Sequence, residues 1–205
     1  MKTILGELFL NINTPLFFTI IISLFIIYTF ITGVLIFAQP KITPNDHNPH
    51  FSTADYFAEE TGPDRGILID NPLDSGLARL KIIGNAQKTL NISYFSIETG
   101  ESPNLFFGAL IEAADRGVKV NLLLDGLFHG IKGEFKPIIY TFMLHPNMSL
   151  KLYEPFNPLM PWTFNNRMHD KYIIADNNIA IIGGRNIGDK YFTPEWYNRK
   201  ITNDR

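Results

Sequence analysis

The sequence contains no cysteine among its 205 residues. Disulfide bonds and thiolate metal sites are therefore excluded, although this absence fits a reducing and an oxidising compartment equally well. A strong charge of one sign is also missing, because 18 lysines and arginines are set against 20 acidic residues and the formal net charge is −2. Since nucleic-acid binding proteins usually carry a basic field, we do not expect nucleic acid as a partner, and a nuclease is disfavoured without being excluded.

A long uncharged run is present near the N-terminus. Residues 16–38 read LFFTIIISLFIIYTFITGVLIFA and follow an N-terminal flank of residues 1–15. As a helix this run spans about 35 Å, whereas the apolar core of a signal peptide has only about 7–15 residues and ends at a small-x-small cleavage site. The sequence therefore predicts an uncleaved transmembrane helix and a single-pass membrane protein. One lysine flanks the run on each side, Lys2 before it and Lys41 after it, so the positive-inside rule gives no orientation. The side of the membrane on which the rest of the chain lies therefore stays open.

The next segment, residues 39–64, carries four prolines and no sustained periodicity. This composition is typical of a linker. His47 and His50 lie in it, but no carboxylate pattern completes a coordination sphere around them. We therefore expect a tether here and no metal site.

From residue 65 onward, strand and helix patterns alternate. A helix with an N-cap at Ser102 and a proline at its first turn ends at Gly117, and it lies between two apolar, β-branched runs. An earlier helix is expected to be capped by Asp74 or Ser75. Strand, helix, strand in this order predicts an α/β sheet with helices on its faces. The expected strands are 66–70 (or an extended segment), 89–97, 118–125 and 148–154, and a further helix is expected at 137–144.

Two loops of this region leave alternatives open. Residues 126–136 follow the carboxyl end of a strand, where α/β sheets tend to bind ligands, so His129 and Lys132 either approach a substrate or are ordinary loop residues. Residues 155–166 contain three prolines among several large apolar side chains. That loop either enters a membrane interface or folds onto the core.

The stretch HDKYIIADNNIAIIGGRN predicts a β-hairpin, with strands at 169–175 and 179–184. In a strand, His169 and Lys171 share a face about 6–7 Å apart, a separation that one phosphate could bridge. Gly183, Gly184 and Asn186 end the second strand, where backbone N–H groups can approach an anion closely. The hairpin therefore predicts a phosphate-binding pocket.

His169-x-Lys171, Asp176 and Gly183-Gly184-x-Asn186 resemble, at matching offsets, the HKD signature of the phospholipase D superfamily. AADRGVKVNLLLDG looks like the first half of the fold of that family, and GGRNIGDKYF, residues 183–192, is most similar to its membrane-anchored, cardiolipin synthase-like branch. The resemblance covers about residues 65–205. It implies an α/β, phospholipase D-like sheet flanked by helices, a glycerophospholipid substrate and a bacterial inner membrane. The serine of the signature is Gly184 here, which removes one hydroxyl donor.

The chemistry of these side chains suggests roles for them. A neutral imidazole can attack a phosphodiester and form a phosphohistidine, so His169 is the expected nucleophile. Lys171 and Asn186 would stabilise the charge on the non-bridging oxygens, and neither a metal nor a cofactor is then required. Asp176 belongs to the signature, but it falls at the turn and is expected to brace the hairpin more than to touch phosphate.

The family combines two HKD motifs in one active site, one histidine attacking while the other protonates the leaving alcohol, and this chain has one. Three interpretations are open: a homodimer that shares the site, a catalytically inactive membrane fragment, and the N-terminal part of a longer two-motif enzyme, which we favour. In the last case the sheet would be incomplete at the C-terminus, with an unpaired edge. The resemblance also implies an acid that orients the histidine, for which Asp204 and then Asp189 are the candidates. We expect a phosphodiesterase or transphosphatidylase, with a one-motif nuclease as the alternative.

Overall fold

The computed structural model describes residues 14–35 and 62–193. These residues form two compact units. One unit joins the N-terminal helix with Asn157–Asn166, and the other holds Pro63–Phe156 and the described residues from Arg167 onward. The predicted linker, including His47 and His50, lies outside the described residues except for residues 62–64. The domain boundaries proposed from the sequence stay a prediction.

The N-terminal helix is α2, Thr14–Phe30, and it continues as a π-helical turn, η1, Ile31–Leu35. Together they form 22 residues, none of which is buried, and an 18-residue window within them has a mean hydropathy of 2.4. By length and composition this helix fits a membrane anchor. The last three residues of the predicted span, 36–38, lie outside the described residues.

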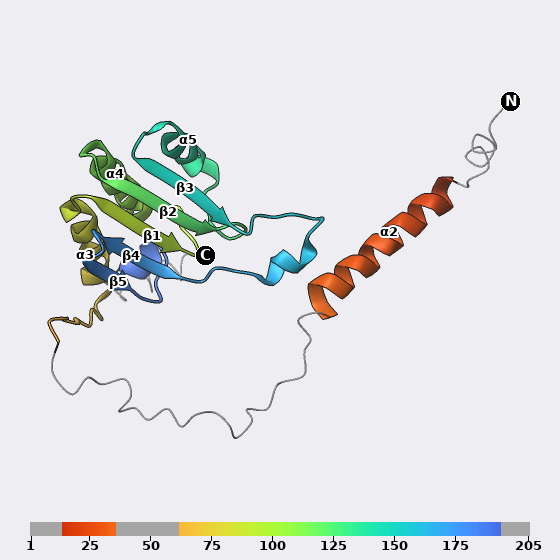
Figure 1. Ribbon diagram of the computed structural model, residues 1–205, viewed down its shortest axis with the longest axis horizontal. Coiled ribbons are helices and arrows are strands. Elements are labelled where there is room, and N and C mark those ends of the chain that lie inside the picture. Colours follow the sequence, from red (N-terminus) through yellow and green to blue (C-terminus); the bar gives the residue numbers. More distant parts are fainter. Residues whose placement is uncertain (1–13, 36–61, 194–205) are drawn as a thin grey trace, which may run out of the picture. The chain divides into compact units, whose positions relative to one another are not determined.

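The second unit is built on a mixed five-stranded sheet with the strand order β3-β2-β1-β4-β5 (Figure 1). The strands β1, β2 and β3 are parallel, whereas β4 runs antiparallel to β1 and forms a hairpin with β5. The predicted α/β sheet with flanking helices is therefore confirmed. The strands are β1 Thr89–Tyr94, β2 Lys119–Asp125, β3 Met148–Tyr153, β4 Lys171–Ala175 and β5 Ile179–Ile182.

Helices connect the parallel strands and cover the sheet. The α3 and α4 helices pack against each other, and α5 packs on β3. These elements are α3 Pro72–Asn85, α4 Glu101–Asp115, the short turn η3 Gly133–Phe135, α5 Lys136–Leu144 and α6 Asp189–Phe192. A further turn, η4 Pro161–Asn165, belongs to the first unit.

The core lies between the sheet and the helices because alternate side chains of each strand point to the same face. In β1 these are Leu90, Ile92 and Tyr94, all of which are almost inaccessible to solvent. Phe106 and Leu110, one turn apart on α4, pack into the same cluster. The strands β1 and β2 are thereby held so that their carboxyl ends reach one edge of the sheet together.

The first helix of this unit begins earlier than the sequence suggests. Its N-cap is Asn71, whose side-chain oxygen accepts the N–H groups of Leu73 at 2.8 Å and Asp74 at 3.2 Å. The predicted cap at Asp74 or Ser75 is therefore wrong. Asn71 precedes a proline at the first helical position, which fixes φ for the helix and makes the residue before it the cap.

The start of α4 also differs from the prediction. Its N-cap is Gly100, with φ at +147°, and the predicted cap Ser102 lies inside the helix. The free N–H groups of Glu101 and Ser102 are capped by the carboxylate of Asp189, at 3.2 and 2.7 Å. A partner 88 residues away in sequence replaces the local cap, which is why local sequence signals misplace this helix start.

Candidate active site

The candidate site lies at the edge of the sheet where the carboxyl ends of the parallel strands meet the amino end of β4. In the register of the sheet, Tyr94, the last residue of β1, pairs with Lys171, the first residue of β4. Asp125 ends β2 at the same edge. The antiparallel insertion of the hairpin beside β1 therefore brings the His-x-Lys motif to the edge where α/β sheets usually bind ligands.

His169 lies just outside the sheet. The strand predicted for residues 169–175 begins only at Lys171, because its partner β1 ends at Tyr94 and offers no further residue to pair with. The side chain of His169 is exposed, and its ring stands edge-on to the ring of Phe95, with the two centroids 4.8 Å apart. The imidazole is thus both accessible and supported by an aromatic face.

Lys171 meets the same aromatic ring. Its ammonium lies 5.5 Å from the centre of the Phe95 ring and donates a hydrogen bond of 2.7 Å to the backbone oxygen of His169. The residue is 5% exposed, and this burial lowers the pKa of Lys171, while the neighbouring Asp170 raises it. Within residues 14–35 and 62–193, no carboxylate forms an ion pair with this ammonium. The motif therefore presents a desolvated cation beside an accessible imidazole.

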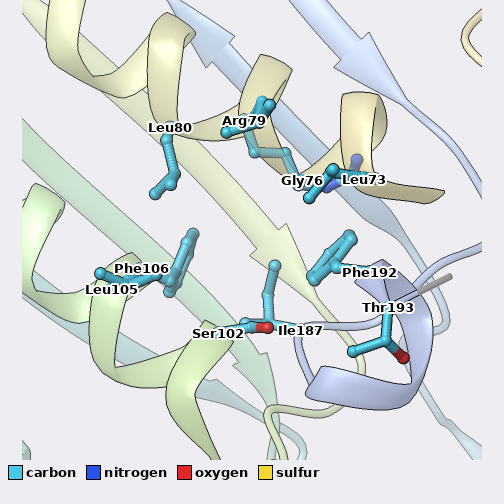
Figure 2. A pocket seen from close by; sticks show the side chains of 11 residues that line it. Leu73, Gly76, Arg79, Leu80, Ser102, Leu105, Phe106, Ile187, Phe192 and Thr193 are labelled. Carbon is cyan, nitrogen blue, oxygen red and sulfur yellow. The ribbon is translucent and has the colours of Figure 1, made fainter. Parts of the chain in front are cut away.

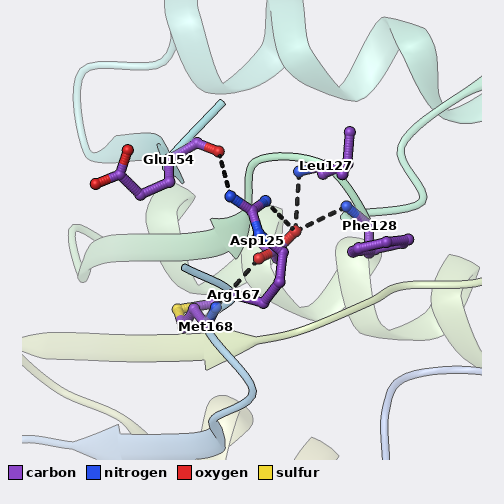
Figure 3. A network of polar contacts seen from close by, with 6 residues as sticks. All are labelled: Asp125, Leu127, Phe128, Glu154, Arg167 and Met168. Atoms are coloured by element: carbon purple, nitrogen blue, oxygen red, sulfur yellow. Dashed lines mark hydrogen bonds and ion pairs between the residues drawn. The ribbon is translucent and has the colours of Figure 1, made fainter. Parts of the chain in front are cut away.

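Asp125 organises the segment that leads into the motif (Figure 3). This carboxylate is fully buried. One oxygen accepts the guanidinium of Arg167 at 3.1 Å and the N–H groups of Leu127 and Phe128 at 2.9 and 2.8 Å. The other oxygen accepts the N–H of Met168 at 3.1 Å, directly before His169. The end of β2 thus fixes both the following loop and the backbone that precedes the histidine.

Asn186 reaches the same edge through a short parallel bridge between Ile97 and Ile187. Its amide is 9% exposed, and Nδ2 lies 3.3 Å from the hydroxyl of Tyr191. Oδ1 is buried and has no hydrogen-bond partner among the described residues. A buried amide oxygen that accepts no hydrogen bond costs free energy. The side chain of Asn186 therefore still has the capacity to form a further hydrogen bond.

The two glycines differ from each other. The N–H of Gly183 donates to the backbone oxygen of Lys171 at 3.1 Å, so it closes the hairpin and is not available to an anion. The expectation that both glycine N–H groups face phosphate is therefore wrong for Gly183. Gly184 is exposed, and a Cβ there would meet nothing within 4 Å, so the serine of the family signature would fit without a clash.

Asp176 lies at the opposite end of β4, at the turn of the hairpin. It follows Lys171 by five positions along the strand, or about 17 Å. Its carboxylate accepts the N–H groups of Gln87, Lys88 and Thr89 at 2.9, 2.7 and 2.8 Å. It thereby ties the hairpin to the start of β1, and the structure does not bring it together with His169 and Lys171.

The stability contributed by Asp176 should depend on pH. The three N–H donors lower the pKa of this carboxyl from its ordinary value of 3.8. Because the folded-state pKa is lower than the unfolded one, the stabilisation is fully present above pH 4 or so and is lost as the pH falls through the folded-state pKa. The difference in unfolding free energy between the parent and Asp176→Asn should therefore shrink on acidification. Denaturant unfolding at pH 7 and pH 3 measures it, and a constant difference would contradict this assignment.

Asp189 and Asp204 are the two candidate acids for orienting His169, and the structure describes only the first. Both carboxylate oxygens of Asp189 cap α4, and a Cβ on Gly100 would collide with this carboxylate. This position favours a structural role for Asp189. Asp204 lies outside the described residues, so its role stays a prediction.

A cavity of about 720 Å³ opens beside Phe95. It is lined by residues that follow β1 and β2, including Phe128, His129 and Lys132. Nδ1 of His129 accepts the N–H of Ile131 at 3.0 Å, and burial lowers the pKa of His129. One ring nitrogen of His129 is therefore engaged in shaping its own loop, and both His129 and Lys132 line the cavity.

A second cavity, of about 240 Å³, lies between α3 and α4 (Figure 2). Its walls are mostly apolar, and none of the residues predicted for the phosphate site lines it. Arg79 borders it as a 3% exposed cation that donates to the hydroxyl of Tyr94 at 2.9 Å and lies over the ring of Phe192. This pocket belongs to the helical layer and not to the candidate site.

Phe95 and Asp125 are the site residues that the sequence analysis did not single out. Each stands at the carboxyl end of a predicted parallel strand, and that position was the available signal. Their contacts with the hairpin are long-range, so no local pattern announces them. In the described part of the chain, no group of three or more histidine, aspartate and glutamate side chains is arranged to hold a metal ion.

The fold and the hairpin are those of a phospholipase D-like domain, and residues 80–204 match the family described as "Cardiolipin synthase, PLD-like domain". The chain therefore belongs to this cardiolipin synthase-like family. It is 36% identical over 133 residues to cardiolipin synthase C of Escherichia coli strain K12, covering 60% of this chain and 28% of that protein. It is 29% identical over 109 residues to a cardiolipin synthase of Staphylococcus aureus strain Mu50, covering 53% and 22%.

Among solved structures, NucT from Helicobacter pylori is similar with a TM-score of 0.46 and 20% sequence identity. The match covers 60% of this chain and 74% of NucT. The chain spans less than a third of the length of the two cardiolipin synthases that it resembles.

Proposed function

We propose that the chain is a membrane-anchored, phospholipase D-like phosphodiesterase or phosphatidyltransferase that acts on glycerophospholipids through a phosphohistidine. The observation that carries the proposal is the meeting of His169 and Lys171 on the ring of Phe95. It combines an accessible nucleophile with a buried cation that has no carboxylate partner among the described residues. Transfer through a phosphohistidine uses the first as the attacking group and the second to stabilise the charge that develops on the phosphate oxygens.

In the first step, a ring nitrogen of His169 attacks the phosphorus of the phosphodiester. The bond from phosphorus to the leaving alcohol breaks, and the alcohol takes a proton from a second acid. Water or an acceptor alcohol then attacks the phosphohistidine, gives up its proton to the same group and releases His169. Phe95 holds the imidazole edge-on, which limits its orientations before the attack.

Lys171 and Asn186 would bind the non-bridging oxygens. An ammonium has three N–H donors, and Lys171 uses one on the backbone of His169, so two remain for phosphate. If the amide of Asn186 turns by 180°, the hydroxyl of Tyr191 donates to Oδ1, and Nδ2 takes the buried position in which Oδ1 now lies, where a phosphate oxygen would be its acceptor. This turn gives the buried oxygen a partner and supplies a phosphate donor at the same time.

The proton donor for the leaving alcohol has to come from a second histidine. When these 205 residues act by themselves, a second copy of the chain contributes it, with the two hairpins related by a two-fold axis. The same symmetry gives each His169 both roles, as nucleophile in one turnover and as acid in another. An active preparation of this chain must therefore be at least dimeric.

A lipid substrate is favoured over nucleic acid by the apolar α2 helix and by the balanced charge of the chain. The cavity beside Phe95 adds room for a substrate group next to the motif. The DNA backbone would instead require several cationic contacts, with binding that weakens steeply as salt is raised. We therefore assign the phosphodiester of a membrane phospholipid to the site.

Product analysis tests this function. The purified chain, solubilised in detergent, is incubated with phosphatidylglycerol, and its mass is measured in the same detergent. We expect cardiolipin or phosphatidic acid to form, with activity in the dimer fraction and none in the monomer fraction. A parallel assay with single-stranded DNA should show neither cleavage nor salt-sensitive binding. A dimer that leaves the lipid intact refutes the proposal, and one that cleaves only DNA replaces it with a nuclease.

A further inference from the structure

The loop Asn157–Asn166 packs against the carboxyl end of the apolar N-terminal helix, within a single compact unit. Two hydrogen bonds join them. The hydroxyl of Tyr28 donates to the backbone oxygen of Leu159 at 3.0 Å, and Nδ2 of Asn165 donates to the backbone oxygen of Gly33 at 2.7 Å. The loop thus contacts the helix at both of its own ends.

The contact covers one stripe of the helix. Over residues 14–35, only Thr29, Thr32 and Gly33 are partly buried, and every other residue is exposed. These positions are three and four residues apart, so they lie on one helical face. The burial pattern is that of a helix with a partner on a single side near its end.

Gly33 lies at the centre of this contact. A Cβ built on it would lie 3.5 Å from the backbone oxygen and 3.7 Å from Cβ of Pro161, so the backbone of the loop lies against the helix where a side chain is missing. Gly33 is also within the π-helical turn, where the wider spiral alters the backbone hydrogen bonding. In a membrane, a carbonyl without a partner is costly, and the amide of Asn165 supplies the donor to Gly33.

We propose that Asn157–Asn166 is a docking loop that binds its own membrane helix at Gly33 and so holds the start of the HKD segment at the bilayer surface. The role in catalysis rests on the proposed function, whereas the contact itself does not. By chain connectivity alone, His169 follows Asn166 by three residues, a reach of at most about 11 Å. Trp162 and Phe164 in the loop are side chains that favour the membrane interface.

Cross-linking tests the contact directly. The Cβ separation at Gly33 and Pro161, 3.7 Å, falls within the range of about 3.5–4.5 Å that a disulfide requires. Because the chain has no cysteine, Gly33→Cys with Pro161→Cys creates the only pair. After oxidation in intact membranes, most of the protein should run on a non-reducing gel as a faster monomer that reverts on reduction.

The matched control is Ile31→Cys with Pro161→Cys. Ile31 is 47% exposed and lies two residues earlier, on a different side of the helix, so this pair should cross-link at least about tenfold more slowly. Equal rates for the two pairs, or a product only at the mass of a dimer, would overturn the docking. This readout needs no enzymatic turnover, so it separates a failure of the docking from a failure of the proposed function.

A second variant links docking to catalysis. Gly33→Leu places a large side chain against Pro161 and should lower the turnover of phosphatidylglycerol in vesicles about tenfold or more. Turnover of a short-chain phosphatidylglycerol dispersed in water should stay within about twofold of the parent. Val34→Leu, at an exposed neighbouring position, is the control and should behave as the parent. A Gly33→Leu variant that loses both activities equally, or neither, would contradict the positioning role.

Discussion

Replacement of His169 with alanine should abolish turnover of phosphatidylglycerol, lowering the rate by at least about a thousandfold. Without the imidazole no covalent phosphohistidine forms, and the difficult displacement cannot be divided into two steps. The remaining groups, Lys171 and Asn186, would still bind phosphate. We therefore expect phosphatidylglycerol to bind the variant about as well as the parent, while the formation of product disappears.

The structure allows this loss to be separated from unfolding. His169 is exposed and its side chain makes one ring contact, with Phe95, so its truncation should change the unfolding free energy by no more than about 0.5 kcal/mol. His145→Ala is the matched control. That histidine faces Asp115 at 3.2 Å, away from the hairpin, and its variant should keep the parent rate. Parent-like turnover in His169→Ala would remove this residue from the mechanism.

Much of the fold could be predicted because its signals are local. The apolar, β-branched runs of β1 and β2, the proline at the start of α4 and the turn at Asp176 and Asn177 each act within a few residues. Both turn residues adopt φ near +54°, as their side chains tolerate. From these signals follow the α/β class, the hairpin and the neighbourhood of His169 and Lys171.

The remaining features depend on residues that are distant in sequence. The cap of α4 comes from Asp189, and the ring that meets both His169 and Lys171 comes from the end of β1. The length of β4 is set by where β1 stops. Each of these three features depends on which strands are neighbours in the sheet. The sequence pattern of a hairpin does not contain this information.

The loop Asn157–Asn166 illustrates the same limit. Its composition left membrane and core as alternatives, because tryptophan, phenylalanine and proline suit either environment. Its hydrogen bonds to residues of the N-terminal helix place it with that helix, more than 120 residues earlier in the chain. A contact of this separation has no sequence signal other than Gly33, where a side chain larger than a methyl group would press against Pro161.

The largest effect on stability is expected at Asp125. Asp125→Ala would remove, at a fully buried position, the acceptor of three backbone N–H groups and the carboxylate partner of Arg167. Breaking a buried pair by removing one partner costs about 3–5 kcal/mol of unfolding free energy. Denaturant unfolding of the whole chain in detergent measures this loss. Asp115→Ala is the control, since that carboxylate is largely exposed and should cost less than about 1 kcal/mol.

A double-mutant cycle then distinguishes how much of the lost unfolding free energy comes from the ion pair and how much from the backbone hydrogen bonds. If the main cost of Asp125→Ala is the loss of the carboxylate beside the guanidinium, adding Arg167→Met should restore part of the lost stability, because the partly buried cation is removed together with its ion-pair partner. If the N–H groups of Leu127, Phe128 and Met168 dominate, the second substitution restores nothing, since those donors remain without an acceptor. An Asp125→Ala variant as stable as Asp115→Ala would mean that the end of β2 does not hold the segment before His169, and the geometry of the site would then need another cause.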